Sequence, residues 1–64
     1  MKKPQEGDWI AHRAMMVNGD IVDHEGMVVS LLSVQFTYED EDGRHRFCMY
    51  DDDWKSEGEA PWLR

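Results

Sequence analysis

Residues 36–49 decide the fold of this chain, and they read FTYEDEDGRHRFCM. Asp42-Gly43 at the centre favours a two-residue type I′ turn, in which both central residues adopt a positive φ. We therefore predict a β-hairpin. The register that this turn sets places charged side chains on one face of the hairpin and aromatic side chains on the other. A slip by one residue would mix the two faces. The predicted cross-strand pairs are Glu41–Arg44 and Glu39–Arg46 on one face, and Tyr38–Phe47 and Phe36–Met49 on the other.

The residues before this hairpin indicate further strands. Asn18-Gly19 is a second type I′ signal, and it would fold residues 9–17 back on residues 20–23, with Met16 facing Ile21. Residues 27–32 (MVVSLL) suit a central strand. This strand would meet residues 34–41 through a bend at Leu32-Ser33. The expected neighbours across that bend are Val29 with Phe36 and Met27 with Tyr38.

The residues after the hairpin predict a turn and a tail. Asp51-Asp52-Asp53-Trp54 is typical of a turn with a side-chain cap, which we expect to form one 3₁₀ turn. Residues 55–64 are polar apart from their last few positions, and Pro61 argues against a central strand there. We expect a single domain over residues 1–64, with the folded core at about 7–54 and an irregular C-terminal extension at 55–64.

About five short antiparallel strands in so short a chain must close on themselves or leave exposed edges. The sequence therefore predicts an all-β fold, a small and strongly bent barrel. At this point the chain resembles the SH3-like barrels of the KOW and Tudor type over residues 7–54. The resemblance rests on Gly7-Asp8-Trp9-Ile10, a long loop, Glu25-Gly26-Met27-Val28-Val29, the strands around Asp42-Gly43, and Asp53-Trp54. It implies a fold and assigns no functional residue.

Composition limits the functions that the chain can perform. Seven Lys/Arg against fourteen Asp/Glu give a formal net charge of −7. This charge disfavours direct binding to nucleic acid or to an anionic membrane. One cysteine excludes an internal disulfide framework. The sequence shows neither a signal peptide nor an apolar run long enough to span a bilayer, so we expect a cytoplasmic protein.

The acidic residues gather in two clusters, residues 39–42 and 51–53, which hold seven of the fourteen acids. Neither cluster has the ligand spacing of an EF-hand. Such runs are usually solvated, but they can also bind a basic protein surface or imitate a nucleic-acid backbone. We predict an acidic face that contacts a basic partner, formed by Glu39, Asp40, Glu41, Asp42, Asp51, Asp52 and Asp53. Trp62 is a possible anchor for the same partner.

Four side chains are of the types that bind metals: His12, His24, His45 and Cys48. None lies at a tight ligand spacing from another, and His45 and Cys48 fall on opposite faces of their predicted strand. We therefore expect no metal site, no cofactor and no catalytic residue. Cys48 is expected to be a small, half-buried residue rather than a nucleophile.

Three tryptophans stand out in a chain of this length. Trp9 and Trp54 are expected to close the two ends of the core, because large rings cover a small core efficiently. Trp62 either folds back over the barrel or contacts a partner or a second copy of the chain.

The sequence favours a non-enzymatic protein-binding module, a small accessory protein of a bacterium, plasmid or phage. One alternative is a DNA mimic that inhibits a nucleic-acid-binding protein. Another is an enzyme whose active site forms between subunits, as in the plasmid-borne type II dihydrofolate reductases, which are also short SH3-like barrels. Residues 34–38 (VQFTY) resemble their Val-Gln-Ile-Tyr motif inexactly, and they precede the Asp-Gly hairpin instead of following it. An acidic chain also lacks the positive potential that anionic substrates require.

Overall fold

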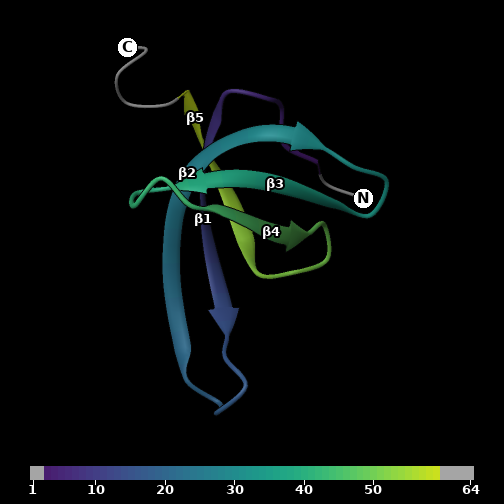
Figure 1. The fold of residues 1–64 in the computed structure, drawn as a ribbon. Helices are drawn as coiled ribbons and strands as arrows, with labels where there is room; N and C mark the ends of the chain where they lie inside the picture. Colours follow the sequence, from purple (N-terminus) through teal and green to yellow (C-terminus); the bar gives the residue numbers. More distant parts are fainter. Residues whose placement is uncertain (1–2, 60–64) are drawn as a thin grey trace.

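Five antiparallel strands form one sheet in the computed structural model, which describes residues 3–59. The strands are β1 (Asp8–Met15), β2 (Ile21–Leu31), β3 (Gln35–Asp40), β4 (His45–Met49) and β5 (Trp54–Glu59), in the order β4-β3-β2-β1-β5 (Figure 1). All regular structure within the described residues is β-strand. The prediction of an all-β fold of about five antiparallel strands is confirmed.

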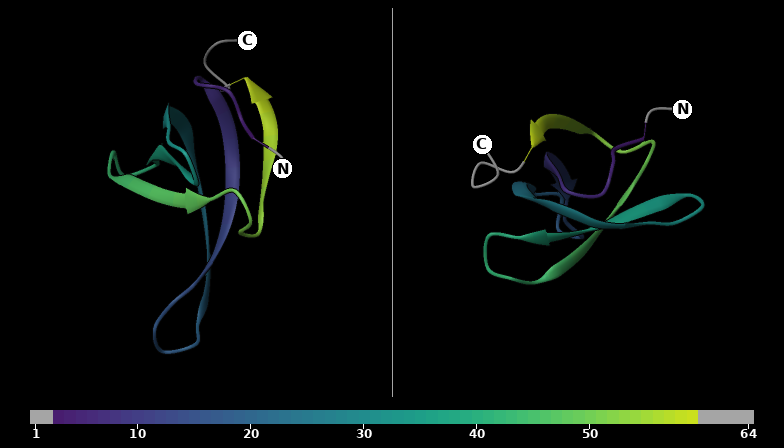
Figure 2. Two further views of the ribbon diagram at one scale, coloured as in Figure 1. Left: turned by 90° about the vertical axis from the view of Figure 1, so that its right-hand side faces the viewer. Right: turned by 90° about the horizontal axis from the view of Figure 1, so that it is seen from above.

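Strand β2 is the longest strand and belongs to both halves of the molecule. Its first part pairs with β1, and its second part curves away to pair with β3, so that β3 and β4 cross β1 and β5 steeply (Figures 1 and 2). Gly26 lies where the two pairings meet, between Ile10 and Asp40. A Cβ atom at Gly26 would lie 2.3 Å from the Glu39 carbonyl oxygen and 2.7 Å from Tyr38 Cδ2. Glycine is therefore required at the bend, because a side chain at this position would collide with the Tyr38 ring that packs against the backbone of Gly26.

The core lies on the concave side of the sheet and is mostly aromatic. The Phe36 ring lies 5.0 Å from Trp54 and 5.9 Å from Tyr50, centroid to centroid. Trp54 Nε1 donates a hydrogen bond to the Tyr50 carbonyl (3.0 Å), which connects the start of β5 to the end of β4. The buried apolar residues are Ile10, Val28, Phe36, Tyr38, Cys48, Tyr50 and Trp54.

The predicted roles of two tryptophans have different outcomes. Trp54 closes the core as expected, with 7% of its surface exposed. The prediction for Trp9 is wrong. Trp9 is only half-buried, since it alternates with the inward-facing Ile10 and therefore lies on the opposite face of β1.

Both predicted type I′ turns are wrong by one residue. Each hairpin has a three-residue loop, residues 17–19 and 41–43, and within the described residues a positive φ occurs only at glycines. Gly19 (φ 92°) and Gly43 (φ 79°) end these loops in the left-handed region, as in a type I turn followed by a bulge. In the second loop the Asp40 carboxylate explains why three residues form the loop in place of two, because it accepts hydrogen bonds from the backbone N–H groups of Asp42 and Arg44.

The loop length shifts the predicted register of β3 and β4. Tyr38 lies opposite Arg46, and Thr37 lies opposite Phe47, instead of Tyr38 opposite Phe47. Phe47 therefore points outward and is 60% exposed. The observed pairs Phe36–Cys48 and Glu39–His45 replace the predicted Phe36–Met49 and Glu39–Arg46, and Arg44 closes the loop opposite Asp40 in place of Glu41. In the first hairpin Met15, not Met16, lies opposite Ile21.

The predicted pairing of β2 with β3 is also wrong, by one position at Tyr38 and by two at Phe36. Val28, not Met27, lies opposite Tyr38, and a bulge between Val28 and Ser30 displaces Val29 from Phe36. A bulge is invisible in the hydrophobic pattern, because it changes the register without changing the residue types.

The chain after Tyr50 differs in part from expectation. A turn with a side-chain cap does form, with Asp52 N–H donating to the Met49 carbonyl and the Asp52 carboxylate accepting from Met49 N–H, but it contains no 3₁₀ helix. The prediction of an irregular extension from residue 55 is wrong up to residue 59, which belongs to β5. This edge strand pairs with β1 and exposes Lys55, Ser56 and Glu57. Because its sequence is polar and lacks the alternation of apolar residues, the strand could not be recognised from the sequence.

Candidate functional site

The convex side of β1, β2, β3 and β5, which we call the outer face, carries the side chains that alternate with the core residues. Trp9, Met27 and Glu39 lie in one row across β1, β2 and β3. Ala11 and Glu25 lie in the next row, where Glu25 N–H also donates to the Glu41 carboxylate (3.3 Å). The outer face comprises Trp9, Ala11, Arg13, Asp23, Glu25, Met27, Glu39, Glu41, Asp53, Lys55 and Glu57.

Two hollows adjoin on this face. The smaller one, about 180 Å³, is lined by Trp9, Met27, Glu39, Asp40 and Glu41. The larger one, about 370 Å³, is lined by Ala11, His12, Arg13, Asp23, Glu25, Asp53, Trp54, Lys55 and Glu57. Trp9 Nε1 donates a hydrogen bond to Glu25 Oε2 (3.2 Å), so an aromatic residue of one hollow is joined to a carboxylate of the other. This hydrogen bond lies between the two hollows, which together are called the depression of the outer face.

The outer face is strongly negative. Six carboxylates lie on it, from Asp23, Glu25, Glu39, Glu41, Asp53 and Glu57, against the two cations Arg13 and Lys55. Arg13 is already engaged, since its Nε lies 2.9 Å from Asp23 Oδ1. The hydrogen bond from Arg13 lowers the pKa of Asp23 below its ordinary value. The depression is therefore a region of negative potential with an indole ring and a thioether at one end.

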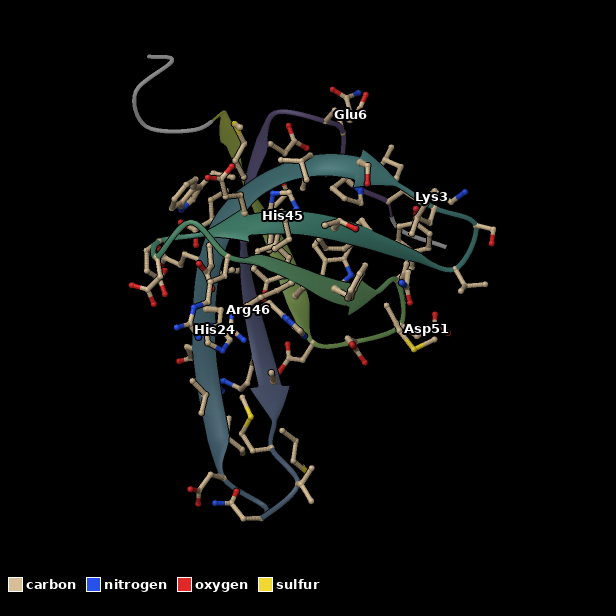
Figure 3. All side chains as sticks on the ribbon, in the orientation of Figure 1. Lys3, Glu6, His24, His45, Arg46 and Asp51 are labelled. Carbon is tan, nitrogen blue, oxygen red and sulfur yellow. The ribbon has the colours of Figure 1, made fainter. Side chains whose placement is uncertain are left out.

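The predicted acidic residues do not form one continuous face. Glu39 and Glu41 lie on the outer face at the hairpin turn, and Asp53 lines the larger hollow. Asp51 lies at the opposite end of the hairpin, beyond the end of β4 (Figure 3). Asp42 is exposed in the 41–43 loop, Asp52 is exposed in the turn after β4, and Trp62 lies outside the described residues.

The prediction that Asp40 contacts a partner is wrong, because its side chain is fully buried. Its Oδ2 accepts a hydrogen bond from Arg46 Nε, while its Oδ1 accepts from Asp42 N–H and Arg44 N–H, both at 2.9 Å. The bond from Arg46, with the two backbone N–H groups, lowers the pKa of Asp40. Asp40 therefore supports the loop that presents Glu39 and Glu41.

Sequence reasoning missed Trp9, Asp23, Glu25 and Glu57 as members of this face. The signal was present in β2, where Asp23 and Glu25 alternate with the inward-facing Val22 and His24. Using it required the correct three-residue loop at 17–19, because that loop decides which residues of β1 and β2 face each other.

On the concave side, three potential metal ligands meet: His12 of β1, Cys48 of β4 and Asp52 of the following turn. One ligand atom from each lies within 4.8 Å of the others. His12 Nε2 lies 3.6 Å from Asp52 Oδ2, and His12 Nδ1 lies 3.0 Å from the Tyr38 hydroxyl. The expectation that the metal-binding types lie apart holds for His45, which is exposed on the other side of β4, and is wrong for His12.

Cys48 is more deeply buried than the predicted half-buried residue, with 1% of its surface exposed. Burial raises the pKa of its thiol to about 12. Burial also lowers the pKa of His12, and the nearby Asp52 opposes this effect. At neutral pH the pair is thus a neutral thiol beside a neutral imidazole, which is not the arrangement of an activated cysteine nucleophile.

His24 lies next to His12 across β1 and β2. Its Nδ1 lies 4.0 Å from Glu41 Oε1, and its Nε2 is the one buried side-chain nitrogen or oxygen of residues 3–58 without a hydrogen-bond partner.

Comparison with protein-family models, with curated proteins and with solved structures found no match for this chain. None of the described residues forms a helix that is long and apolar enough to cross a membrane.

Proposed function

We propose that this chain is a non-enzymatic protein-binding module of the cytoplasm that holds a basic segment of a larger protein in the depression of its outer face. One observation carries the proposal: Trp9 lies beside three carboxylates on one face of the paired strands β1, β2 and β3 and of the loop after β3. These carboxylates belong to Glu25, Glu39 and Glu41. An accessory protein of a bacterium, plasmid or phage is the kind of protein we infer, since the chain is small and acidic.

The depression suits a lysine or arginine side chain. The aliphatic stem of such a residue would pack on the Trp9 ring and Met27, as long cationic side chains commonly do on apolar surfaces. Its charged head would then reach the carboxylates of Glu25, Glu39 and Glu41. Charge-assisted hydrogen bonds to these groups, with a cation–π contribution from the indole, are the interactions that select a cation over an apolar residue.

The backbone supports this site before any partner arrives. Trp9, Glu25 and Glu39 lie on paired strands and not on loops, and Glu41 is held through its bond from Glu25 N–H. Groups that are already in place lose little conformational entropy on binding, which favours affinity. The buried thiol and the neutral imidazole described above support a binding role over an enzymatic one.

Binding of a panel of lysine- and arginine-rich peptides, followed by fluorescence anisotropy, tests the proposal. Glu39→Gln/Glu41→Gln should weaken the best peptide about tenfold, because two charge-assisted contacts are lost. The matched control is Glu6→Gln/Asp51→Asn, which removes the same charge from exposed positions away from the hairpin turn (Figure 3). The control should change the affinity less than about twofold.

Equal losses in the two double variants would overturn the proposal, since they would show that only the net charge matters. Affinity that stays flat as the salt concentration rises would also contradict it, because contacts to exposed carboxylates are screened. In the DNA-mimic alternative, the partner would instead be a nucleic-acid-binding protein from which duplex DNA displaces this chain.

A further inference from the structure

We propose that His12, Cys48 and Asp52 form a binding site for one zinc ion on the concave side of the sheet. The site joins β1, β4 and the turn after β4, three segments that are distant in sequence. His12 also lines the larger hollow of the outer face, but the zinc site does not depend on the function proposed above.

The spacing of the ligand atoms fits a shared ion better than it fits direct contact. At 3.6 Å, His12 Nε2 and Asp52 Oδ2 are too far apart for a normal hydrogen bond. Two ligands bound to one tetrahedral zinc ion at about 2.0 Å each lie roughly 3.3 Å apart. The imidazole and the carboxylate therefore already have nearly the separation of two zinc ligands.

The thiol completes the set with a small movement. The three ligand atoms lie within 4.8 Å of one another. Sulfur and nitrogen ligands of a tetrahedral zinc ion lie roughly 3.5 Å apart, so the sulfur has to move by about 1.3 Å at most. Asp52 lies on an exposed turn, so its side chain can adjust to the position of the ion.

Neighbouring groups orient both polar ligands. The Tyr38 hydroxyl oxygen lies 3.0 Å from His12 Nδ1 and can accept a hydrogen bond from Nδ1–H, which leaves the lone pair of Nε2 directed at the site. The Tyr38 ring also packs edge-on against the imidazole, with an interplanar angle of 90°. Met49 N–H donates to Asp52 Oδ2 (3.2 Å) and holds the carboxylate near the end of β4.

The ligand types select the metal. One nitrogen, one sulfur and one oxygen suit zinc, whereas calcium and magnesium prefer oxygen ligands alone. The side chain of Asp52 is 47% exposed, so a water molecule can fill the fourth position from the solvent side. On binding, the Cys48 S–H bond breaks, a zinc–sulfur bond forms, and the proton is released to solvent.

Cobalt(II) is the probe for the test, because its thiolate complexes absorb by charge transfer in the near ultraviolet and its tetrahedral complexes absorb strongly in the visible. The full chain should bind one equivalent of cobalt with both bands, and zinc should displace it. Cys48→Ser should lose the charge-transfer band. Asp52→Asn should bind at least about tenfold more weakly, while the matched control Asp51→Asn should bind like the wild type.

Thermal unfolding keeps the test decisive if Cys48→Ser folds poorly. Asp52→Asn changes an exposed side chain, so this variant should still fold. Zinc in excess should raise the midpoint of unfolding of the wild type and of Asp51→Asn by several degrees, and of Asp52→Asn by much less. The proposal is overturned if cobalt gives no charge-transfer band, or if Asp51→Asn and Asp52→Asn respond to zinc alike.

Discussion

Arg46 donates a hydrogen bond to the buried carboxylate of Asp40 beneath the turn between β3 and β4. The same carboxylate closes the three-residue loop through the N–H groups of Asp42 and Arg44. The Asp40 carboxylate therefore stabilises the three-residue loop, and the loop length sets the register of β4. The register in turn places Glu39 and Glu41 on the outer face and Cys48 near His12.

Replacing Asp40 by asparagine tests this role. The variant keeps an acceptor for one backbone N–H group but removes the charge that pairs with Arg46, so we expect the midpoint of thermal unfolding to fall by about 5–10 °C. Glu39→Gln is the control, because Glu39 is the exposed neighbour of Asp40. It should shift the midpoint by less than about 2 °C, and equal shifts in the two variants would contradict the role of Asp40.

The pH dependence of stability follows from the same ion pair. The pKa of Asp40 is lower in the folded chain than its ordinary value of 3.8. Its contribution is therefore present above pH 3.8 and is lost as the pH falls through the folded pKa. The difference in unfolding midpoint between the wild type and Asp40→Asn should be constant from pH 7 to about 5 and shrink below about pH 4. A difference that does not change with acidification would refute this assignment.

Gly26→Ala should be much more damaging than Gly43→Ala. A Cβ at Gly26 would collide with the Glu39 carbonyl and the Tyr38 ring, and the backbone cannot easily move there. We expect a loss of about 3 kcal/mol or more in the free energy of unfolding. At Gly43 a Cβ would make only an ordinary contact with Glu39 Oε1 at 3.8 Å, so alanine there should cost about 1 kcal/mol because of the positive φ. Urea denaturation measures both, and similar losses would contradict the close packing at Gly26.

The register of the β3–β4 hairpin can be tested at two phenylalanines. Phe36 is fully buried, and Phe36→Ala should cost about 3–5 kcal/mol. Phe47 points outward, so Phe47→Ala should cost less than about 1 kcal/mol. In the two-residue-turn register, Phe47 would lie opposite Tyr38. A large loss for Phe47→Ala would therefore favour that register over the observed one.

The sequence predicted the fold class but not the details that depend on single side chains. Turn signals at Asn18-Gly19 and Asp42-Gly43 correctly located two hairpins. The loop length depended on where Asp40 places its carboxylate, which a dipeptide signal does not contain. In the observed register, which differs from the predicted one by one residue, Arg46 points inward and Phe47 points outward.

Prediction of the candidate site was limited for the same reason. The two acidic clusters were visible in the sequence, but membership of one face depends on the register of three strands. Glu25 and Trp9 belong to that face although neither lies in an acidic cluster. The meeting of His12 with Cys48 depends on the bend of the whole sheet, and ligand spacing along one strand contains no information about it.

A chemical-shift titration of the ¹⁵N-labelled chain with an arginine-rich peptide tests the central claim most directly. The outer-face account predicts that the largest changes occur at the Trp9 indole N–H and at the backbone N–H groups of Glu25, Glu39 and Glu41. It further predicts that these changes disappear in Glu39→Gln/Glu41→Gln. Changes centred on residues 51–53, or spread evenly over all exposed acidic residues, would contradict the account.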